Sequence, residues 1–243
     1  MNIERIRPAI FDSISTVEAF FTPANRSSIN LDGAITGLNL GNNTDAPEAE
    51  ILQNFALLFD EQEAVALAEQ VHGSDVVVVD SPGLIQGVDG LVTRQAGLTI
   101  GIKVADCAAL LIADPENDIV AALHAGWRGA ADGIVATGVS VMKELGGNPS
   151  AMRVYISPCI SAENFEVGEE VAARFPESAI DRSHAKPHID LKKFLKDELL
   201  DAGIPFSQIE CDQQCTVGSD RFYSYRREGS MAGRMLGYIK LMG

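Results

Sequence analysis

The sequence predicts a mixed-sheet fold of the α+β or α/β class, and three observations predict it. Apolar runs typical of strands are interspersed with segments in which apolar residues recur every three or four positions, as in helices. Two strand-like runs flank the turn sequence 114–118, which predicts an antiparallel hairpin rather than a purely parallel, doubly wound sheet. The 243 residues, of which 46% are hydrophobic, can bury a large core, and we expect one domain over 1–243.

The N-terminal quarter is expected to contain little regular structure. Residues 1–30 have no periodic pattern, and residues 33–43, with three glycines and three asparagines, predict a strand and a loop. A helix is expected next, with Asp45 as its N-cap, Pro47 in the first turn and Glu48 completing a capping box. Its predicted apolar face consists of Ile51, Leu52, Phe55 and Leu58.

The middle of the chain is rich in strand signals. Residues 64–80 predict two strands around a turn at 72–75. Further strands are expected at 98–106, 107–114, 118–126 and 152–160. If Ala113 faces Ile119 across the turn, Cys107 and His124 come opposite each other within one residue of register. Their Cβ atoms would then be about 5 Å apart.

Three helices are expected in the second half. The first has one apolar face, ends at Gly146-Gly147 and covers Ile134, Val135, Val139, Met142 and Leu145. A shorter helix is predicted over 168–175. The third begins at Asp190, as its N-cap, and runs to Gly203.

Charge and composition exclude several classes of protein. The formal net charge of −15 repels nucleic acid and anionic lipid, so we expect no nucleic-acid or membrane partner. The sequence has no apolar run near the ~20 residues that span a bilayer, and its N-terminus does not resemble a secretory signal. Four cysteines in a chain of this length do not indicate a disulfide scaffold, so we expect reduced thiols and a cytoplasmic protein. The sequence does not indicate an oligomeric state.

The predicted hairpin brings together two residues that bind metals. A thiolate from Cys107 and an imidazole from His124 could share one metal, with bonds of ~2.3 and ~2.0 Å, or form a thiolate–imidazolium pair. Each residue taken alone would more often be part of the core, and the metal site is favoured because two separate segments bring these residues to one place. His72, at a strand end beside Gly73, is the third candidate ligand, although it could be an ordinary turn histidine.

Arginine and glycine residues suggest a site for an anion. HAGWRG precedes a helix, and Gly126 and Gly129 would let the backbone approach a ligand to which Arg128 could donate. The alternative is an ordinary strand-to-helix turn with Trp127 packed beneath it. Four arginines near the C-terminus could form a positive patch for an anionic substrate group or only pair with surface carboxylates: Arg221, Arg226, Arg227 and Arg234.

Other polar residues have weaker signals. Asp106 is expected on the sheet face opposite Cys107, in solvent by default, or else orienting a metal ligand. His184 and His188 are spaced like ligands on a helix, but Pro187 between them argues against a helix interior. The cysteines of CDQQC, Cys211 and Cys215, are better explained as partly buried thiols than as a second metal pair.

Several motifs together resemble one known family. QVHGSDVVVVD, VDGLVT, VADCAALLIAD, HAGWRGAADGIV, ISPCISAENFEVGEEV and FYSYRREGSMAGR are similar to segments of the YfiH family, also called the laccase-domain or polyphenol-oxidase-like family. The resemblance runs from about residue 37 to residue 234. The order of QVHG, ADC and HAGWRG is its most specific part. The sequence departs from the family pattern in the segment GLNLGNN and at Phe165, where the family tends to have tyrosine.

The resemblance implies a fold, a metal site and an activity. The fold is an α+β arrangement of mixed sheets in α/β/β/α layers, likened to a cysteine hydrolase. The metal is zinc, held by His72, Cys107 and His124. The implied activity is phosphorolysis of adenosine, inosine, guanosine and methylthioadenosine, accompanied by adenosine deamination. On this basis Arg128 joins the three ligands as a catalytic candidate, and the substrate-binding candidates are Asn39, Glu166, Arg226 and Arg227.

Three other functions remain open from the sequence. A copper-dependent polyphenol oxidase would use a similar ligand set, but a multicopper enzyme needs more histidines than the four present. A metal-free Cys–His hydrolase, for which the family suggests cell-wall precursors as substrates, would use Cys107 as nucleophile. A module with structural zinc would need a fourth protein ligand, for which the sequence offers no candidate at a fixed spacing.

Overall fold

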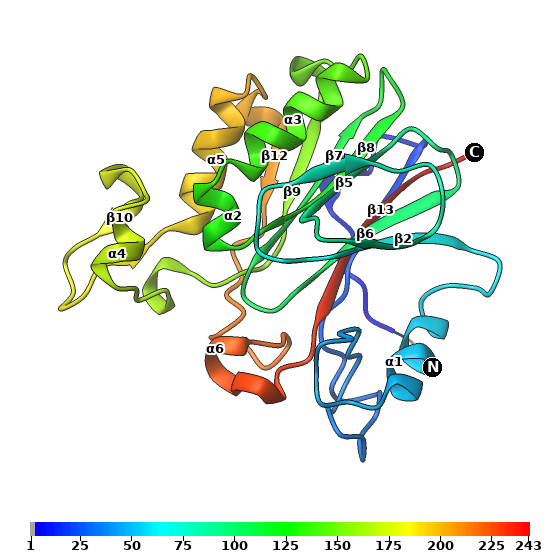
Figure 1. Cartoon of the computed structure of the whole chain (residues 1–243), viewed down its shortest axis with the longest axis horizontal. Coiled ribbons are helices and arrows are strands. Elements are labelled where there is room, and N and C mark those ends of the chain that lie inside the picture. Colours follow the sequence, from blue (N-terminus) through cyan, green and yellow to red (C-terminus); the bar gives the residue numbers. More distant parts are fainter. Residues whose placement is uncertain (1–2) are drawn as a thin grey trace.

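The computed structural model describes residues 3–243, which form two large mixed β-sheets (Figure 1). The five-stranded sheet has the order β1-β13-β6-β2-β4, with strands Val17–Phe21, Met235–Leu241, Leu98–Val104, Ala64–Glu69 and Gly83–Gln86. The six-stranded sheet has the order β12-β9-β7-β8-β5-β3, with strands Ile209–Cys211, Arg153–Ile156, Ala108–Asp114, Ile119–Ala125, Gly90–Thr93 and Val76–Val78. A separate two-stranded ribbon pairs β10 (Ile180–Asp181) with β11 (His188–Ile189).

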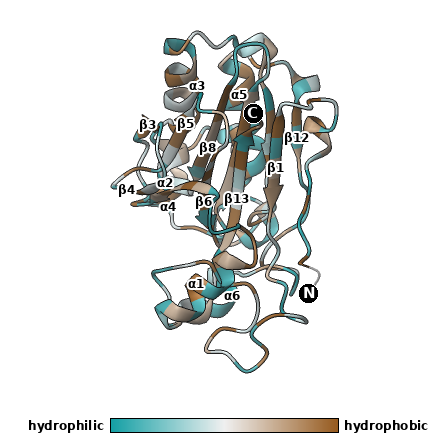
Figure 2. Ribbon diagram, turned by 90° about the vertical axis from the view of Figure 1, so that its right-hand side faces the viewer, coloured by the Kyte–Doolittle hydropathy of each residue, from teal (hydrophilic) through white to brown (hydrophobic). Residues whose placement is uncertain are grey.

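The two sheets pack face to face, and alternate residues of β7 point to opposite sides of the six-stranded sheet. Leu110 and Ile112 belong to the apolar cluster shared with the helices, whereas Ala109 and Leu111 belong to the cluster shared with the five-stranded sheet. All seven residues of β7 are buried, because both faces of this strand are covered. Figure 2 shows the same arrangement as predominantly hydrophobic strands in the centre of the molecule.

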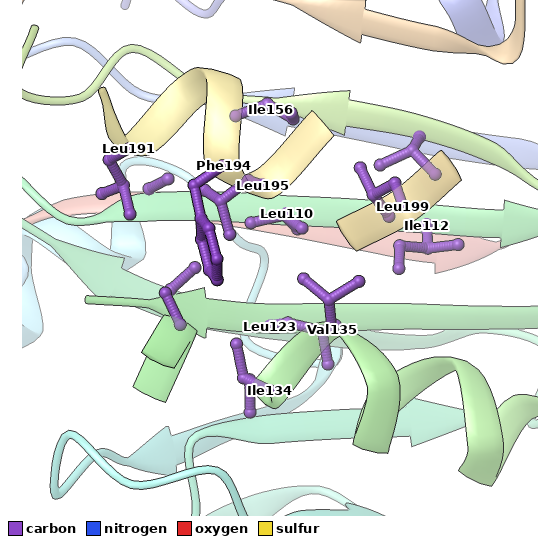
Figure 3. Close-up of a cluster of buried hydrophobic side chains, with 14 of the residues drawn as sticks. Leu110, Ile112, Leu123, Ile134, Val135, Ile156, Leu191, Phe194, Leu195 and Leu199 are labelled. Atoms are coloured by element: carbon purple, nitrogen blue, oxygen red, sulfur yellow. The ribbon is translucent and has the colours of Figure 1, made fainter. Parts of the chain in front are cut away.

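Helices α3 (Ile134–Glu144) and α5 (Leu191–Asp201) cover the outer face of the six-stranded sheet. Figure 3 shows their apolar side chains against Leu110, Ile112 and Leu123 of the sheet. Beyond the five-stranded sheet, a third cluster joins Leu236 and Tyr238 of β13 to residues around α1 (Glu48–Ala56). This order of helix, sheet, sheet and helix confirms the expected α/β/β/α layers.

The predicted helices are present, with differences at the first one. The helices near 134–145 and 190–203 are confirmed: Asp190 caps α5 by accepting the Lys193 N–H at 2.9 Å. The helix expected at 168–175 is limited to α4 (Glu169–Ala172). The predicted start of α1 is wrong, because Pro47 rather than Asp45 is its N-cap and no side chain caps it. Leu52 is 63% exposed and is therefore not part of the buried face.

The strand predictions are wrong where pairing with strands distant in the sequence determines the structure. β1 lies within the segment expected to be irregular, and it is held by antiparallel pairing with β13 at the far end of the chain. The strands predicted around the turn at 72–75 are β2 and β3, but they lie in different sheets and do not pair with each other. Among residues 3–243, every helix is too short or too polar to span a lipid bilayer.

The predicted hairpin exists as β7 and β8, but its register differs by one residue. Ala113 faces Val120, so Ala109 faces His124, and Cys107 lies just before β7 begins. The error arises because the connecting turn is one residue longer than assumed on the His124 side. Cys107 and His124 are therefore diagonal neighbours rather than directly opposite residues.

Candidate metal centre

Three chain segments leave the sheets at the same place. The chain passes from the five-stranded to the six-stranded sheet three times, between β2 and β3, between β4 and β5, and between β6 and β7. His72 lies in the first of these connections and Cys107 in the third, and His124 is the penultimate residue of β8. His72 (φ 62°) and Asp106 (φ 80°) both adopt left-handed backbone conformations, which are uncommon for residues other than glycine. This strain at the two connections indicates a local geometry fixed by tertiary contacts.

The side chains of His72, Cys107 and His124 converge. Their ligand atoms, one per residue, all lie within 4.8 Å of one another, and they are the only group of three or more metal-type side chains found among residues 3–243. The two imidazole rings are 4.9 Å apart between centroids and inclined by 76°. His124 is buried, Cys107 is half-buried and His72 is exposed, so the group opens to solvent on the His72 side.

Asp89 connects two of these residues, and the sequence interpretation missed it. It is fully buried, and its carboxylate lies 2.7 Å from His124 Nδ1. The same carboxylate accepts the backbone N–H groups of Val71, His72 and Gly73 at 2.7–3.1 Å. Asp89 thereby fixes the connection that contains His72 and directs His124 Nε2 toward Cys107. Its signal was its position in the motif VDGLVT, a carboxylate directly before a buried strand.

The charges of this group favour an ionised thiol. Burial opposes ionisation of Cys107, but the charge and hydrogen bond of His124, joined by His72, outweigh it and lower the pKa of the thiol to about 6. Burial alone would also lower the pKa of His124, whereas Cys107 and Asp89 raise it to about 9. Hydrogen bonds from His124 and Gly73 hold the pKa of Asp89 below its usual value despite burial. Thiolate is the form of cysteine that binds metals and attacks electrophiles.

The donor set and the space beside it fit a metal ion. One thiolate and two imidazoles are a suitable ligand set for zinc, and three protein ligands leave a fourth position open. A Cβ added at Gly126 would lie 3.0 Å from Cys107 Sγ, 3.3 Å from His72 Cδ2 and 3.6 Å from His124 Cε1. Only a residue without a side chain leaves this space free beside all three side chains. At Gly129, the other glycine of the motif, the backbone lies close to the backbone of Gly73. A Cβ at Gly129 would lie 2.4 Å from the Gly73 carbonyl oxygen.

Gly126→Ala is expected to lower metal occupancy at least tenfold at limiting zinc while the chain remains folded. The backbone at Gly126 (φ −72°, ψ 164°) is accessible to alanine, so the effect comes from the added methyl group and not from strain. Zinc titration with a chromogenic competitor would measure it. Gly218→Ala is the matched control, because its Cβ meets only Cys215 Cβ, at 3.9 Å. Equal zinc affinity in both variants would show that the space beside the three side chains is not used.

A cavity of about 810 Å³ opens beside the three side chains, which all line it. Three of the predicted arginines, Arg128, Arg226 and Arg234, also line it. Arg227 does not: its guanidinium donates to the carbonyls of Thr216, Val217, Ser219 and Phe222 and pairs with Glu228. Trp127 lines the cavity under Arg128, whose guanidinium carbon is 5.1 Å from the Trp127 ring centroid.

The other two substrate-binding candidates lie behind the cavity wall. Asn39 is fully buried, and its side-chain oxygen accepts the backbone N–H groups of Gly41 and Arg234. Glu166 forms an exposed ion pair with Lys186, and only its carbonyl reaches Arg226, accepting both Nη groups at 3.1 Å. The structure therefore places Asn39 and Glu166 where they position cavity arginines rather than among the lining residues.

Asp106 is not in solvent as expected by default. It is buried and accepts hydrogen bonds from Thr216 Oγ1, Ser224 Oγ and the Arg226 backbone N–H. It therefore anchors α6 (Tyr225–Glu228), which contains Arg226, next to the cavity.

The remaining histidines and cysteines lie outside the lining of the cavity. His184 and His188 stack with ring centroids 4.4 Å apart in and beside the β10–β11 ribbon. Cys211 is the last residue of β12. Cys215 pairs with Cys159 through an isolated β-bridge of the backbone. All four cysteines are free thiols.

The comparisons with known proteins agree with this geometry. A family model described as multi-copper polyphenol oxidoreductase laccase matches residues 19–242. The chain belongs to this family. The match includes all three side chains of the candidate metal centre and Asp89, so the family resemblance of the sequence motifs is confirmed.

Several relatives of this laccase-family chain carry names that refer to purine metabolism. A purine nucleoside phosphorylase of Deinococcus radiodurans is 35% identical over 94% of the chain and 90% of its own length. A purine nucleoside phosphorylase of Corynebacterium glutamicum is 34% identical over 84% of the chain and 86% of its own length. Adenosine deaminase RL5, from an unknown prokaryotic organism, is 30% identical over 91% of the chain and 93% of its own length.

Solved structures of the family have the same fold. YlmD from Geobacillus stearothermophilus superposes with a TM-score of 0.88 and 28% identity, covering 96% of this chain and 94% of that one. The hypothetical protein YfiH of Bacillus licheniformis gives a TM-score of 0.88 at 26% identity, covering 99% and 97%.

Proposed function

We propose that this chain is a zinc-dependent purine nucleoside phosphorylase that also deaminates adenosine. The observation that carries the proposal is the convergence of His72, Cys107 and His124 beside a cavity large enough for a nucleoside. Two relatives, the Deinococcus radiodurans purine nucleoside phosphorylase and adenosine deaminase RL5, match more than nine tenths of the chain and support the substrate class. The proposed substrates are adenosine, inosine, guanosine and methylthioadenosine, with phosphate as the second substrate of phosphorolysis. Free thiols in the site suit a cytoplasmic enzyme.

The residues of the site have separable roles in this proposal. His72, Cys107 and His124 hold the zinc, which when bound supplies a Lewis acid and an activated water. Asp89 keeps the proton of His124 on Nδ1, so that Nε2 faces the metal position. Phe165 offers an aromatic face in the cavity, with the Arg226 guanidinium 5.8 Å from its ring centroid. Arg128 and Arg226 provide positive charge for phosphate in a strongly acidic protein.

Loss of the phosphate-binding arginine is expected to raise the KM for phosphate roughly 10- to 150-fold, the value of a charge-assisted hydrogen bond. Arg128→Ala and Arg226→Ala are the variants to compare, with phosphate and nucleoside varied separately. Deamination uses water, so it should change much less. Arg227→Ala is the control, because Arg227 binds backbone carbonyls outside the cavity and should affect stability instead. An unchanged KM for phosphate in both cavity variants would contradict this assignment.

A panel of nucleosides with and without phosphate tests the proposed function. The zinc-loaded chain should release hypoxanthine from inosine only when phosphate is present, and should convert adenosine to inosine in its absence. Base release that does not depend on phosphate would indicate a hydrolase. No reaction with any of the four nucleosides would contradict the proposal.

A metal-free Cys–His hydrolase is the second candidate function, because Asp89, His124 and Cys107 are aligned as acid, base and nucleophile. The lowered pKa of Cys107 suits a nucleophile as well as a ligand. Removing zinc with a chelator distinguishes the two candidates. A hydrolase would retain activity and lose it to iodoacetamide, whereas the proposed enzyme would lose activity on chelation and recover it with zinc.

Copper-dependent polyphenol oxidation, which the family description suggests, has less support. The ligands of the group are compatible with copper. An oxygen-reducing copper cluster needs several more imidazoles, and the two remaining histidines do not line the cavity. We therefore propose zinc as the metal of this site.

A further inference from the structure

The wall of the cavity formed by the five-stranded sheet has two cations with no assigned role. Lys103 is the penultimate residue of β6, and Arg234 directly precedes β13, the neighbouring strand. Both side chains line the cavity. Arg128 and Arg226, by contrast, come from α2 (Trp127–Ala131), which follows the six-stranded sheet, and from α6. The two pairs of cations therefore belong to different structural elements around the same cavity.

Neither Lys103 nor Arg234 forms an ion pair with a carboxylate in the described part of the chain. The Lys103 ammonium donates to Asn42 Oδ1 at 3.3 Å. Arg234 Nη1 donates to the carbonyls of Ala232 and Gly233 at 2.5 and 3.2 Å, while its Nε and Nη2 make no hydrogen bond within residues 3–243. Glu69 also lines the cavity and partly offsets the charge of Lys103 from a longer distance. Unpaired cations in a wall are unusual for a protein with 34 acidic and 19 basic residues.

The surrounding structure holds both cations in place. Gln70 clamps the backbone of Lys103, accepting its N–H at 2.8 Å and donating to its carbonyl at 2.7 Å. The segment GLNLGNN packs against Arg234. The metal centre does not explain the role of this segment. Asn39 accepts the Arg234 backbone N–H, and a Cβ at Gly41 would lie 2.4 Å from Arg234 Cγ. Asn42 and Asn43, at the end of this segment, line the cavity beside the two cations.

Burial disfavours the charged forms of Lys103 and Arg234, so a nearby negative charge would stabilise them. Burial lowers the pKa of Lys103, and the charge of Arg234 lowers it further. Burial likewise lowers the pKa of Arg234, and Arg234 lines the same cavity as Cys107. Two adjacent cations that repel each other in a partly desolvated wall are stabilised when an anion binds between them.

We propose that Lys103 and Arg234, with Asn42, form a second anion subsite of the cavity, which binds a phosphate group. The geometry supplies an ammonium, two unengaged guanidinium positions and a side-chain amide, which match the several oxygens of a phosphate. The ligand is either inorganic phosphate or the 5′-phosphate of a purine nucleotide, which share this chemistry. The choice of phosphate rests on the proposed function, whereas the site itself rests on the placement of the two cations.

Calorimetric titration of the zinc-loaded chain with inorganic phosphate and, separately, with adenosine 5′-monophosphate tests the subsite. In Lys103→Gln, at equal zinc content, the Kd of at least one ligand should rise roughly 10- to 150-fold, and Lys103→Arg should restore most of the affinity. Lys143→Gln, which removes the same charge from the exposed side of α3, is the matched control and should bind like the wild type.

The two ligands separate the possible sources of the phosphate group. A rise only for inorganic phosphate assigns the subsite to the second substrate, and a rise only for the nucleotide assigns it to a 5′-phosphate. Unchanged affinity for both ligands in Lys103→Gln would overturn the inference. Because binding is measured without turnover, failure of phosphorolysis in the nucleoside panel and failure of this subsite are distinguishable.

Discussion

Cys107→Ser and His124→Ala are each expected to reduce zinc content to background and turnover by at least about 10³-fold. The metal is expected to contribute several kcal/mol of transition-state stabilisation, and each ~1.4 kcal/mol corresponds to a factor of ten in rate. Each variant removes one of the three proposed zinc ligands. Serine is nearly the same size as cysteine but binds zinc poorly at neutral pH because its hydroxyl remains protonated. The core beside the site should therefore stay intact in Cys107→Ser.

Thermal unfolding measured with the assays separates a catalytic from a structural metal. A catalytic zinc predicts folded variants with melting temperatures within a few degrees of the wild type. A structural zinc would instead contribute directly to folding, so both variants would melt far lower. A Cys107→Ser variant that keeps full activity without metal would refute both the zinc proposal and the thiol nucleophile.

Asp89→Asn is expected to weaken zinc binding roughly 10- to 100-fold, the usual effect of changing a group that orients a metal ligand. The amide cannot accept every hydrogen bond that the carboxylate accepts from His124, His72, Val71 and Gly73. At least one N–H group bonded to this buried carboxylate then loses its partner, which should cost about 1–3 kcal/mol of unfolding free energy. Zinc competition titrations and urea unfolding of the same preparation would measure the two effects.

Asp114→Asn is the matched control for this prediction. Asp114 is also fully buried and also accepts four hydrogen bonds, from Glu116, Asn148 and both nitrogens of Asn117. It lies at the opposite end of the β7–β8 hairpin from His124. The control should therefore lose stability without losing zinc affinity. Equal zinc affinity in both variants would mean that Asp89 contributes only to the stability of the fold and not to zinc binding.

Local sequence patterns correctly predicted the elements that are determined by neighbouring residues, namely two capped helices and a hairpin. The helix capped by Asp190 and the helix ended by Gly146 were both expected from caps and periodicity, and both are present. The approach of Cys107 to His124 was also predicted, because one tight turn joins their strands and the register error was one residue. A hairpin is short enough for its turn to determine which residues meet.

Long-range pairing could not be read from the same patterns. β1 has its partner more than 200 residues away, and nothing in its own sequence distinguishes it from an irregular segment. The assignment of β2 and β3 to different sheets has the same origin, yet this change of sheet is what places His72 beside Cys107. Asp89 was missed because its role depends on three N–H groups that are 16 to 18 residues earlier in the chain.

The arginines show why charge in the sequence does not define a site. Arg226, Arg227 and Arg234 lie within nine residues, and only the structure separates them. Arg227 donates its hydrogen bonds to backbone carbonyls, whereas Arg226 and Arg234 both line the cavity. Their different roles follow from Asp106 and Asn39, which position the segment from distant parts of the chain.

Elemental analysis of the purified chain, with zinc and copper measured together, tests directly whether the chain holds a zinc ion. We expect one zinc ion per wild-type chain, no stoichiometric copper, and loss of the zinc in Cys107→Ser and His124→Ala at unchanged fold. Stoichiometric copper, or zinc that both variants retain, would contradict a zinc centre formed by His72, Cys107 and His124.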